Sequence, residues 1–259
     1  MVTGATSGIG YELARCLVRD GFNLVLVSRN ELMLNQIKKN FEEEFTVSVK
    51  ILPKDLSIPN IAFEIYSELE NTEIKLDILI NNAGFGVFGP FTSSSWEKES
   101  EMIQVNAVAL THLCKLFARD MSRRGGGRIL NVASTAAFFP GPLMAVYYAT
   151  KAYVVSFSEA IRDEFRGTGV TVTVLCPGPT KTGFQKAASL ENSGLVKNRK
   201  MPSAEEVAAY GYKAMLRGRA VVIQGFWNRI FVFFAKFLPR TLLAHAVRKI
   251  QENKVKIQI

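Results

Sequence analysis

Apolar residues along the chain follow two alternating patterns. Short runs rich in Val, Ile and Leu, almost without polar breaks, are typical of strands buried on both faces. These runs occupy residues 22–28, 47–52, 76–81, 128–134 and 170–176. Between them, longer segments place apolar residues every three or four positions, as amphipathic helices do. The helical segments occupy residues 8–20, 30–44, 60–72, 96–123 and 145–166.

The alternation of strand and helix predicts an α/β fold with a doubly wound parallel β-sheet and helices on both faces. Ligands of such sheets bind beyond the carboxyl ends of the strands. No repeat or low-complexity linker divides the chain, so we expect one domain over residues 1–225 and a basic, amphipathic helical extension over residues 226–259. Only Met1 and Val2 precede the first turn, whereas a strand usually needs about five residues. We therefore expect a clipped first strand, with translation starting upstream or the numbering starting inside the strand.

The charge of the chain is uneven, which limits its partners. Among 259 residues, 48% are hydrophobic and 21% are charged, the balance of one globular domain. Residues 196–259 carry 13 Lys and Arg against 3 Asp and Glu, whereas residues 1–195 carry 19 against 20. Nucleic-acid binding is therefore not predicted for the domain. The 3 cysteines lie in no metal-binding or disulfide spacing, so we expect no metal and a reducing compartment.

A glycine-rich turn, TGATSGIG at residues 3–10, follows the first strand and opens the first helix. Glycine lets the backbone approach a pyrophosphate closely, and a helix N-terminus attracts its negative charge. The turn predicts a dinucleotide site. The site residues expected here are Gly4, Thr6, Ser7, Gly8, Ile9 and Gly10. The alternative is a purely structural turn, in which Gly and Ser only allow the chain to enter the helix.

The end of the second predicted strand indicates which dinucleotide binds. An acidic residue there would hold the ribose 2′-hydroxyl of NAD, but the chain has Arg29. A guanidinium can pair with a 2′-phosphate through two hydrogen bonds, so NADP(H) is favoured over NAD(H). The alternative is a solvated arginine at the start of a helix.

Three residues are candidates for catalysis. Tyr147 and Lys151 are four residues apart in a predicted helix, so both project from one face. That pair alone is uninformative, because surface pairs of this spacing are common. Ser134 precedes Tyr147 by thirteen residues, at the end of a predicted strand, and gives the pair meaning. The alternative for Ser134 is an ordinary helix cap.

Taken in order, these motifs resemble those of the short-chain dehydrogenase/reductase family. The residues that carry the resemblance, over about residues 1–185, are TGATSGIG, Asn81-Asn82-Ala83-Gly84, Asn106, Ser134, Tyr147 with Lys151, and Pro177-Gly178. The resemblance implies a Rossmann-type fold and hydride transfer between a nicotinamide cofactor and a carbonyl or alcohol. It implies that Tyr147, not the adjacent Tyr148, is the general acid/base, and that Tyr148 packs. Ser134 would then hydrogen bond the substrate oxygen, and Lys151 would hold the nicotinamide ribose.

The resemblance assigns further roles to matched positions. Asn106 would hold a water that connects Lys151 to solvent, the alternative being a buried amide satisfied by backbone. Besides the glycine-rich turn, Tyr147 and Lys151, the implied cofactor contacts are Asp55, Leu56, Asn82, Ala83, Gly84, Pro177, Gly178 and Thr182. Asp55 taken alone is equally typical of a turn or cap. A homodimer or homotetramer is also implied, built on the helices at residues 96–123 and 145–166.

A phenol exchanges protons near neutral pH only if its pKa falls from about 10. A lysine ammonium about 4.5 Å away supplies about 3.7 kcal/mol of phenolate stabilisation at an effective dielectric constant of about 20. We therefore expect Lys151 to lower the pKa of the Tyr147 hydroxyl.

Aromatic residues gather in the two segments expected to border the nicotinamide, residues 85–96 and 136–146. The side chains concerned are Phe85, Phe88, Phe91, Phe138, Phe139, Leu143 and Met144. Pockets for uncharged ligands are mostly apolar, so an apolar ketone, aldehyde or alcohol, such as a fatty-acyl, sterol or aromatic compound, is the expected substrate. The alternative is that part of this aromatic content belongs to the core.

The tail adds an apolar segment at residues 226–238 and an amphipathic basic helix at residues 241–251. Neither reaches the roughly 18 apolar residues that span a bilayer, so we expect a cytoplasmic protein. One interpretation of residues 226–251 is peripheral contact with anionic lipid. The favoured alternative is a helix that covers the pocket or is buried in a dimer. Rival functions are a non-catalytic dinucleotide-binding protein of this fold and a membrane-surface regulatory protein.

Overall fold

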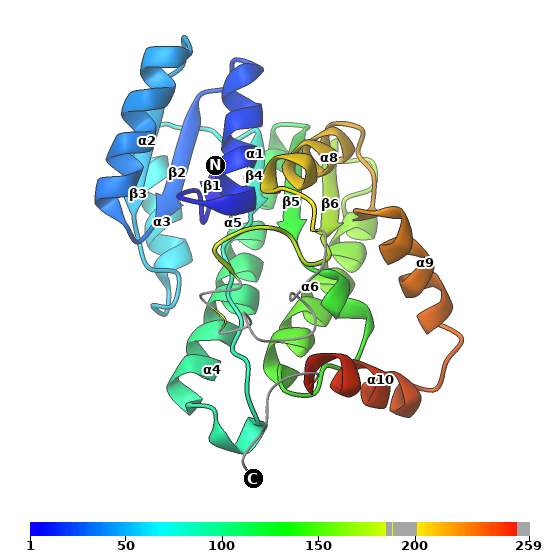
Figure 1. Ribbon diagram of the computed structural model, residues 1–259. Helices are drawn as coiled ribbons and strands as arrows, with labels where there is room; N and C mark the ends of the chain where they lie inside the picture. Colours follow the sequence, from blue (N-terminus) through cyan, green and yellow to red (C-terminus); the bar gives the residue numbers. More distant parts are fainter. Residues whose placement is uncertain (185–187, 189–200, 253–259) are drawn as a thin grey trace.

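The parallel sheet predicted from the sequence is confirmed. A computed structural model describes residues 1–184, 188 and 201–252. Within them, seven parallel strands follow the order β3-β2-β1-β4-β5-β6-β7 (Figure 1). The strands are β1 Val2–Thr3, β2 Leu24–Ser28, β3 Val49–Pro53, β4 Ile78–Asn81, β5 Gly127–Val132, β6 Val170–Cys176 and β7 Val221–Ile223. The strand order reverses between β1 and β4, which opens a crevice at their carboxyl ends.

Helices follow the strands and cover both faces of the sheet. The α-helices are α1 Gly8–Arg19, α2 Glu31–Glu44, α3 Ile61–Glu70, α4 Trp96–Ile103, α5 Leu110–Arg123, α6 Ala145–Glu164, α8 Ala204–Leu216, α9 Phe226–Ala235 and α10 Arg240–Glu252. Shorter helical segments are η1 Phe91–Ser93, η2 Gln104–Ala109 and η3 Thr135–Phe138. Helices α9 and α10 lie on the side of the molecule away from β3 and α2 (Figure 1).

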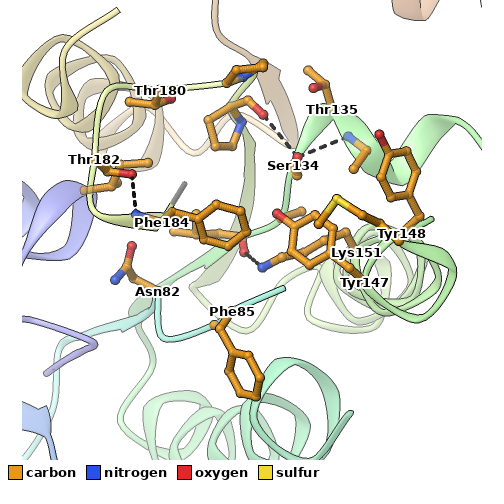
Figure 2. Close-up of a pocket in the computed structure, with 18 of the residues that line it drawn as sticks. Asn82, Phe85, Ser134, Thr135, Tyr147, Tyr148, Lys151, Thr180, Thr182 and Phe184 are labelled. Carbon is orange, nitrogen blue, oxygen red and sulfur yellow. Dashed lines mark hydrogen bonds between the residues drawn. The ribbon is translucent and has the colours of Figure 1, made fainter. Parts of the chain in front are cut away.

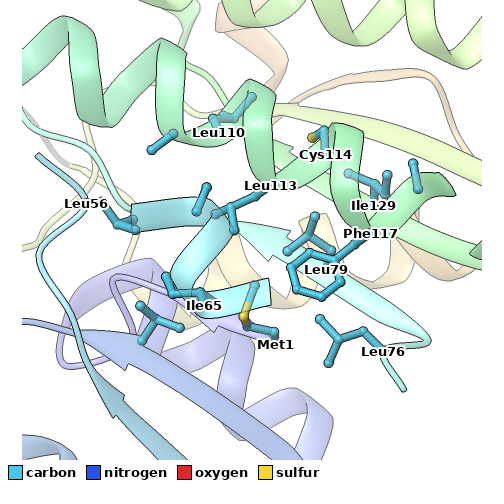
Figure 3. Close-up of a cluster of buried hydrophobic side chains, with 14 of the residues drawn as sticks. Met1, Leu56, Ile65, Leu76, Leu79, Leu110, Leu113, Cys114, Phe117 and Ile129 are labelled. Atoms are coloured by element: carbon cyan, nitrogen blue, oxygen red, sulfur yellow. The ribbon is translucent and has the colours of Figure 1, made fainter. Parts of the chain in front are cut away.

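Alternate residues of each strand enter two separate apolar cores, because successive side chains of a strand point to opposite faces. In β2, Val25 and Val27 pack with α3, α5 and α6, whereas Leu24 and Leu26 pack with α1, α2 and α8. Figure 3 shows the first core, where Leu79 of β4 and Ile129 of β5 lie under α5. Burial on both faces explains why the strands read as continuous apolar runs.

The main differences from the predicted elements are at four places. The single helix predicted over residues 96–123 is divided into α4 and α5 by η2, a π-helical segment. The strand predicted over residues 128–134 ends at Val132, and Ser134 caps η3 instead. Helix α8 and strand β7 were not predicted; α8 begins with a capping box and packs against α1, and β7 extends the sheet by one short strand.

Candidate active site

A cavity of about 830 Å³ lies beyond the carboxyl ends of the strands. Its walls come from the loops that follow β1 to β6 and from α9 and α10. Every catalytic or cofactor-binding residue predicted from the sequence lines this cavity except Gly10 and Asn106, which pack against the residues of its wall. The sequence motifs therefore converge on one place.

The glycine-rich turn is held tightly against the end of β4. The Asn82 side-chain amide donates to the carbonyls of Thr3 and Gly4, both at 3.1 Å. A Cβ on Gly4 would lie 2.9 Å from the Cα of Ala83, and Gly4 has a φ of 64°, which favours glycine. A Cβ on Gly10 would collide with the Gly4 carbonyl and the Asn82 amide. The turn thus has no room for a side chain at Gly4 or Gly10, so its backbone lies close against the end of β4 at these two positions.

Arg29 and Asp55 form the other end of the cavity. The Arg29 side chain is 73% exposed and lies 3.9 Å from an Asp55 carboxylate oxygen. Burial raises the pKa of Asp55, but hydrogen bonds from the backbone and hydroxyl of Ser57, with the charge of Arg29, outweigh it and hold the pKa below its usual value. Leu56 is buried beside them. The exposed guanidinium of Arg29 therefore lies next to the Asp55 carboxylate, which hydrogen bonds from Ser57 hold in place.

The three catalytic candidates lie together in the same cavity near the end of β5, which β1 and β4 separate from β2 and Arg29 (Figure 2). Tyr147 lies in the first turn of α6, and the ammonium of Lys151 lies 5.8 Å from the centre of its ring. The same ammonium donates to the carbonyl of Val132 at 2.9 Å, which ties it to the end of β5. Ser134 accepts from the Ala136 backbone at 3.1 Å and donates to the Pro177 carbonyl at 3.4 Å. Ser134 is thus the helix cap considered above, and it also contacts the Tyr147 hydroxyl.

Burial governs the ionisation of this group. It raises the pKa of the Tyr147 hydroxyl, and the hydrogen bond with Ser134 lowers it by less. Burial also lowers the pKa of Lys151 to about 8. The expected lowering of the Tyr147 pKa by Lys151 is therefore not found among the protein's own groups, because desolvation of the phenolate is the larger effect. At neutral pH Tyr147 is protonated and Lys151 is largely a cation.

Asn106 lies in the π-helical segment η2, where the register change turns its amide inward. Its side chain accepts from the Phe85 backbone at 3.1 Å and donates to the Phe85 carbonyl at 3.0 Å and to Thr150 at 3.1 Å. These contacts match a buried amide satisfied largely by backbone. Asn106 thus fixes the segment after β4, and its role in holding a water stays a prediction.

The loop after β6 lines the cavity and approaches the glycine-rich turn. A Cβ on Gly8 would lie 3.2 Å from Thr182, whose hydroxyl accepts from the Phe184 backbone at 3.2 Å. The Phe184 ring packs on Tyr147 with its centre 5.5 Å away (Figure 2). We did not predict Phe184, because its contact with Tyr147 depends on a loop path that no periodicity reveals. Pro177 and Gly178 line the same wall.

The apolar wall beside Tyr147 differs in part from the prediction. Of the seven side chains predicted there, Phe85, Phe139 and Met144 line the cavity. The other four do not line it: Phe91 is exposed on η1, and Phe138 packs against the core below η3. Their places are taken by residues of α9 and α10. These are Asn228, Phe231, Val232, Phe234 and Ala235 of α9 and Leu243, Ala246, Val247 and Ile250 of α10; Leu238, between the two helices, also lines the cavity.

The C-terminal helices cover the cavity, as the favoured alternative for the tail stated. Gln251 of α10 is fully buried and donates to the Tyr148 hydroxyl at 2.9 Å. Tyr148 packs beside Tyr147 as predicted, and it also anchors α10. Residues 253–259 of the predicted extension lie outside the described residues. No helix in the described parts of the chain is long and apolar enough to cross a membrane.

Comparison with known proteins identifies the family. A family model described as "short chain dehydrogenase" matches residues 1–193. The chain belongs to the short-chain dehydrogenase family. A mouse (Mus musculus) very-long-chain 3-oxoacyl-CoA reductase is 32% identical over 79% of this chain and 64% of its own length. Mouse 17-beta-hydroxysteroid dehydrogenase type 3 is 36% identical over 72% of this chain and 61% of its own length.

A solved short-chain dehydrogenase from Sphingobium yanoikuyae, in complex with NADPH, has a TM-score of 0.81 and 29% identity to this chain. The match covers 91% of this chain and 93% of that protein. This short-chain dehydrogenase thus spans less than two thirds of the length of the two mouse relatives and nearly all of the solved one.

Proposed function

We propose that the protein is an NADP(H)-dependent oxidoreductase that interconverts an apolar ketone or aldehyde and its alcohol. The observation that carries the proposal is the position of Ser134, Tyr147 and Lys151 in one cavity with the glycine-rich turn and Arg29. The alternative, a non-catalytic dinucleotide-binding protein, would not need three reactive side chains at the end of that cavity away from Arg29.

The residues present fit a nicotinamide adenine dinucleotide. Gly4 and Gly10 leave no room for side chains where the backbone at the start of α1 would approach a pyrophosphate. Arg29 would hold the 2′-phosphate of NADP, and Lys151, with ammonium hydrogens beyond the one given to Val132, would hold the nicotinamide ribose. When bound, the nicotinamide supplies or accepts the hydride.

Proton transfer falls to Tyr147. Its raised pKa keeps the hydroxyl protonated, so it can donate a proton to a carbonyl oxygen as negative charge develops there. The Ser134 hydroxyl would donate a hydrogen bond to the same oxygen in place of its long bond to the Pro177 carbonyl. The positive charge of Lys151 would act against the cost of burying the phenolate that remains, without outweighing it. These ionisation states favour reduction of the carbonyl compound.

The apolar wall supports the substrate class. Phe85, Phe139 and Met144 line the same cavity as apolar residues of α9 and α10. The names of the two mouse relatives denote action on very-long-chain 3-oxoacyl-CoA and on a 17-hydroxysteroid, both with large apolar parts. We propose a substrate of comparable apolar size for this protein.

The test is oxidation of NADPH against a series of ketones of increasing chain length, with NADH as the cofactor control. We expect kcat/KM to rise with chain length and NADPH to be preferred. Replacement Arg29→Ala should weaken NADPH binding about 10- to 100-fold, since a charge-assisted hydrogen bond contributes about 1.5–3 kcal/mol, and leave NADH binding unchanged. A flat chain-length series would contradict the apolar substrate, and equal use of NADH by the unaltered protein would contradict the cofactor assignment.

A further inference from the structure

Helix α9 and the residues after it expose a broad apolar surface, which we call the aromatic face. It consists of Phe226, Trp227, Phe231, Phe233, Phe234, Phe237, Leu238 and Leu242. These side chains are between 50% and 71% exposed, whereas Val232 and Ala235 on the other side of α9 are buried against the protein. Soluble monomers seldom expose so many large apolar side chains together, and such patches mark interaction sites.

The aromatic face is continuous with the cavity. Phe231, Phe234 and Leu238 belong to the face and also line the cavity. Ile250 of α10 is likewise exposed and lines the cavity. The apolar lining of the cavity therefore continues onto the surface of the protein at these residues.

The segment that carries the aromatic face also contains several positively charged side chains. Residues 226–252 contain five Lys and Arg and a single acidic residue, Glu252. The five cations, all exposed, are Arg229, Lys236, Arg240, Arg248 and Lys249. Glu252 lies 2.6 Å from Arg248, so the remaining cations have no carboxylate within residues 226–252 to neutralise them.

Apolar side chains with interspersed cations suit the interface of an anionic bilayer, where aromatic rings enter the headgroup region and each Lys or Arg is attracted to the negative headgroups. A second copy of the chain suits this face less well. A symmetric dimer would place the same cations of both copies against each other and close the cavity opening.

We infer that the aromatic face lies on an anionic membrane surface, with the opening of the cavity toward the lipid, so that an apolar substrate enters directly from the bilayer. Lipid binding stands on the exposed side chains and charges alone. Entry of the substrate from lipid also rests on the proposed function.

The first test is co-sedimentation of the protein with phosphatidylcholine vesicles, with and without phosphatidylserine. We expect binding to the vesicles that contain phosphatidylserine and loss of binding at high salt, because salt screens the attraction of the cations. The variants Trp227→Ser with Phe237→Ser, and Lys236→Glu with Arg240→Glu, should each weaken binding about tenfold or more.

Matched controls remove comparable side chains elsewhere. Leu32→Ser with Phe63→Ser removes exposed apolar residues of α2 and α3, and Lys39→Glu reverses a charge on α2. These variants should bind vesicles like the unaltered protein. Failure of the unaltered protein to bind, or equal losses in the controls, would overturn the inference.

The mass of the protein in solution, measured by light scattering, tests whether a second copy of the chain covers the aromatic face instead. A dimer that Trp227→Ser with Phe237→Ser converts to a monomer would overturn the inference in favour of a second copy. The expected result is that this variant keeps the mass of the unaltered protein.

Turnover tests the entry route separately. In the variant Trp227→Ser with Phe237→Ser, kcat/KM for a long-chain ketone dissolved in the vesicles should fall in parallel with lipid binding. The kcat/KM of the same variant for a short, water-soluble ketone should not change, because neither residue lines the cavity. Equal losses on both ketones would overturn the entry route. Absence of turnover on every ketone, with vesicle binding intact, would refute the proposed function and leave lipid binding standing.

Discussion

Burial sets the ionisation of the single residues at the candidate active site. Tyr147 and Lys151 are both buried, and desolvation shifts their pKa values in opposite directions, upward for the phenol and down to about 8 for the ammonium. The sequence predicted which residues meet, since Ser134 and the Tyr147–Lys151 pair follow from spacing. It could not predict these shifts, because they arise from neighbours such as Phe184 that only the fold brings near.

The pH dependence of ketone reduction tests these shifts. Reduction needs Tyr147 protonated, which its raised pKa ensures, and Lys151 charged, which is lost as pH rises through its pKa of about 8. We expect kcat/KM for reduction to be constant below about 8 and to fall above it. The variant Lys151→Arg should move the fall to higher pH, because a guanidinium keeps its proton. A fall that begins below neutral pH, or an identical profile in Lys151→Arg, would contradict this explanation.

The elements position the site through their ends. The Asn82 amide at the end of β4 holds the turn after β1, and the π-helical segment η2 turns Asn106 toward the segment after β4. Four of the five predicted strands end within one residue of the predicted position, because short apolar runs mark them, whereas β5 ends two residues early. The break at η2 was not, since residues 104–109 continue a helical pattern, and β7 was missed because three residues give too short a run.

Replacement Gly10→Ala tests the packing of the turn. The added Cβ would collide with the Gly4 carbonyl and the Asn82 amide, so we expect a loss of about 1–3 kcal/mol in folding free energy and weaker NADPH binding. Chemical denaturation and fluorescence titration with NADPH measure both. The control Gly126→Ala meets only an ordinary contact at 3.7 Å and should change neither. Unaltered cofactor affinity in Gly10→Ala would argue against a backbone cradle at this turn.

At the scale of the whole molecule, one cavity has both a polar part and an apolar part. The cavity contains the exposed guanidinium of Arg29, and it is also lined by apolar residues of α9 and α10. The amphipathic pattern of the tail was visible in the sequence, but its docking site was not, since Gln251 meets Tyr148 across 103 residues of chain. The four predicted side chains that miss the cavity show the same limit: aromatic content marks apolar surroundings without saying which wall it forms.

Self-association is also expected at this scale. Val108 of η2 and Tyr153 of α6 are exposed, and Tyr153 stacks on Phe157 and hydrogen bonds to Thr111 of α5 at 3.0 Å. We expect a dimer or tetramer through α5 and α6. Light scattering should show a smaller mass for the Tyr153→Glu variant. Association would bury the charged glutamate at the interface, and this cost weakens the oligomer. A monomeric unaltered protein would contradict this expectation.

The most direct test compares two adjacent tyrosines on α6. The variant Tyr147→Phe should reduce kcat/KM for NADPH-dependent ketone reduction about 100- to 10,000-fold, the contribution of a positioned general acid, while NADPH still binds. The matched variant Tyr148→Phe loses only the hydrogen bond to Gln251 and should retain most of the activity. Retained turnover in Tyr147→Phe, with NADPH bound, would contradict the assignment of the proton to Tyr147.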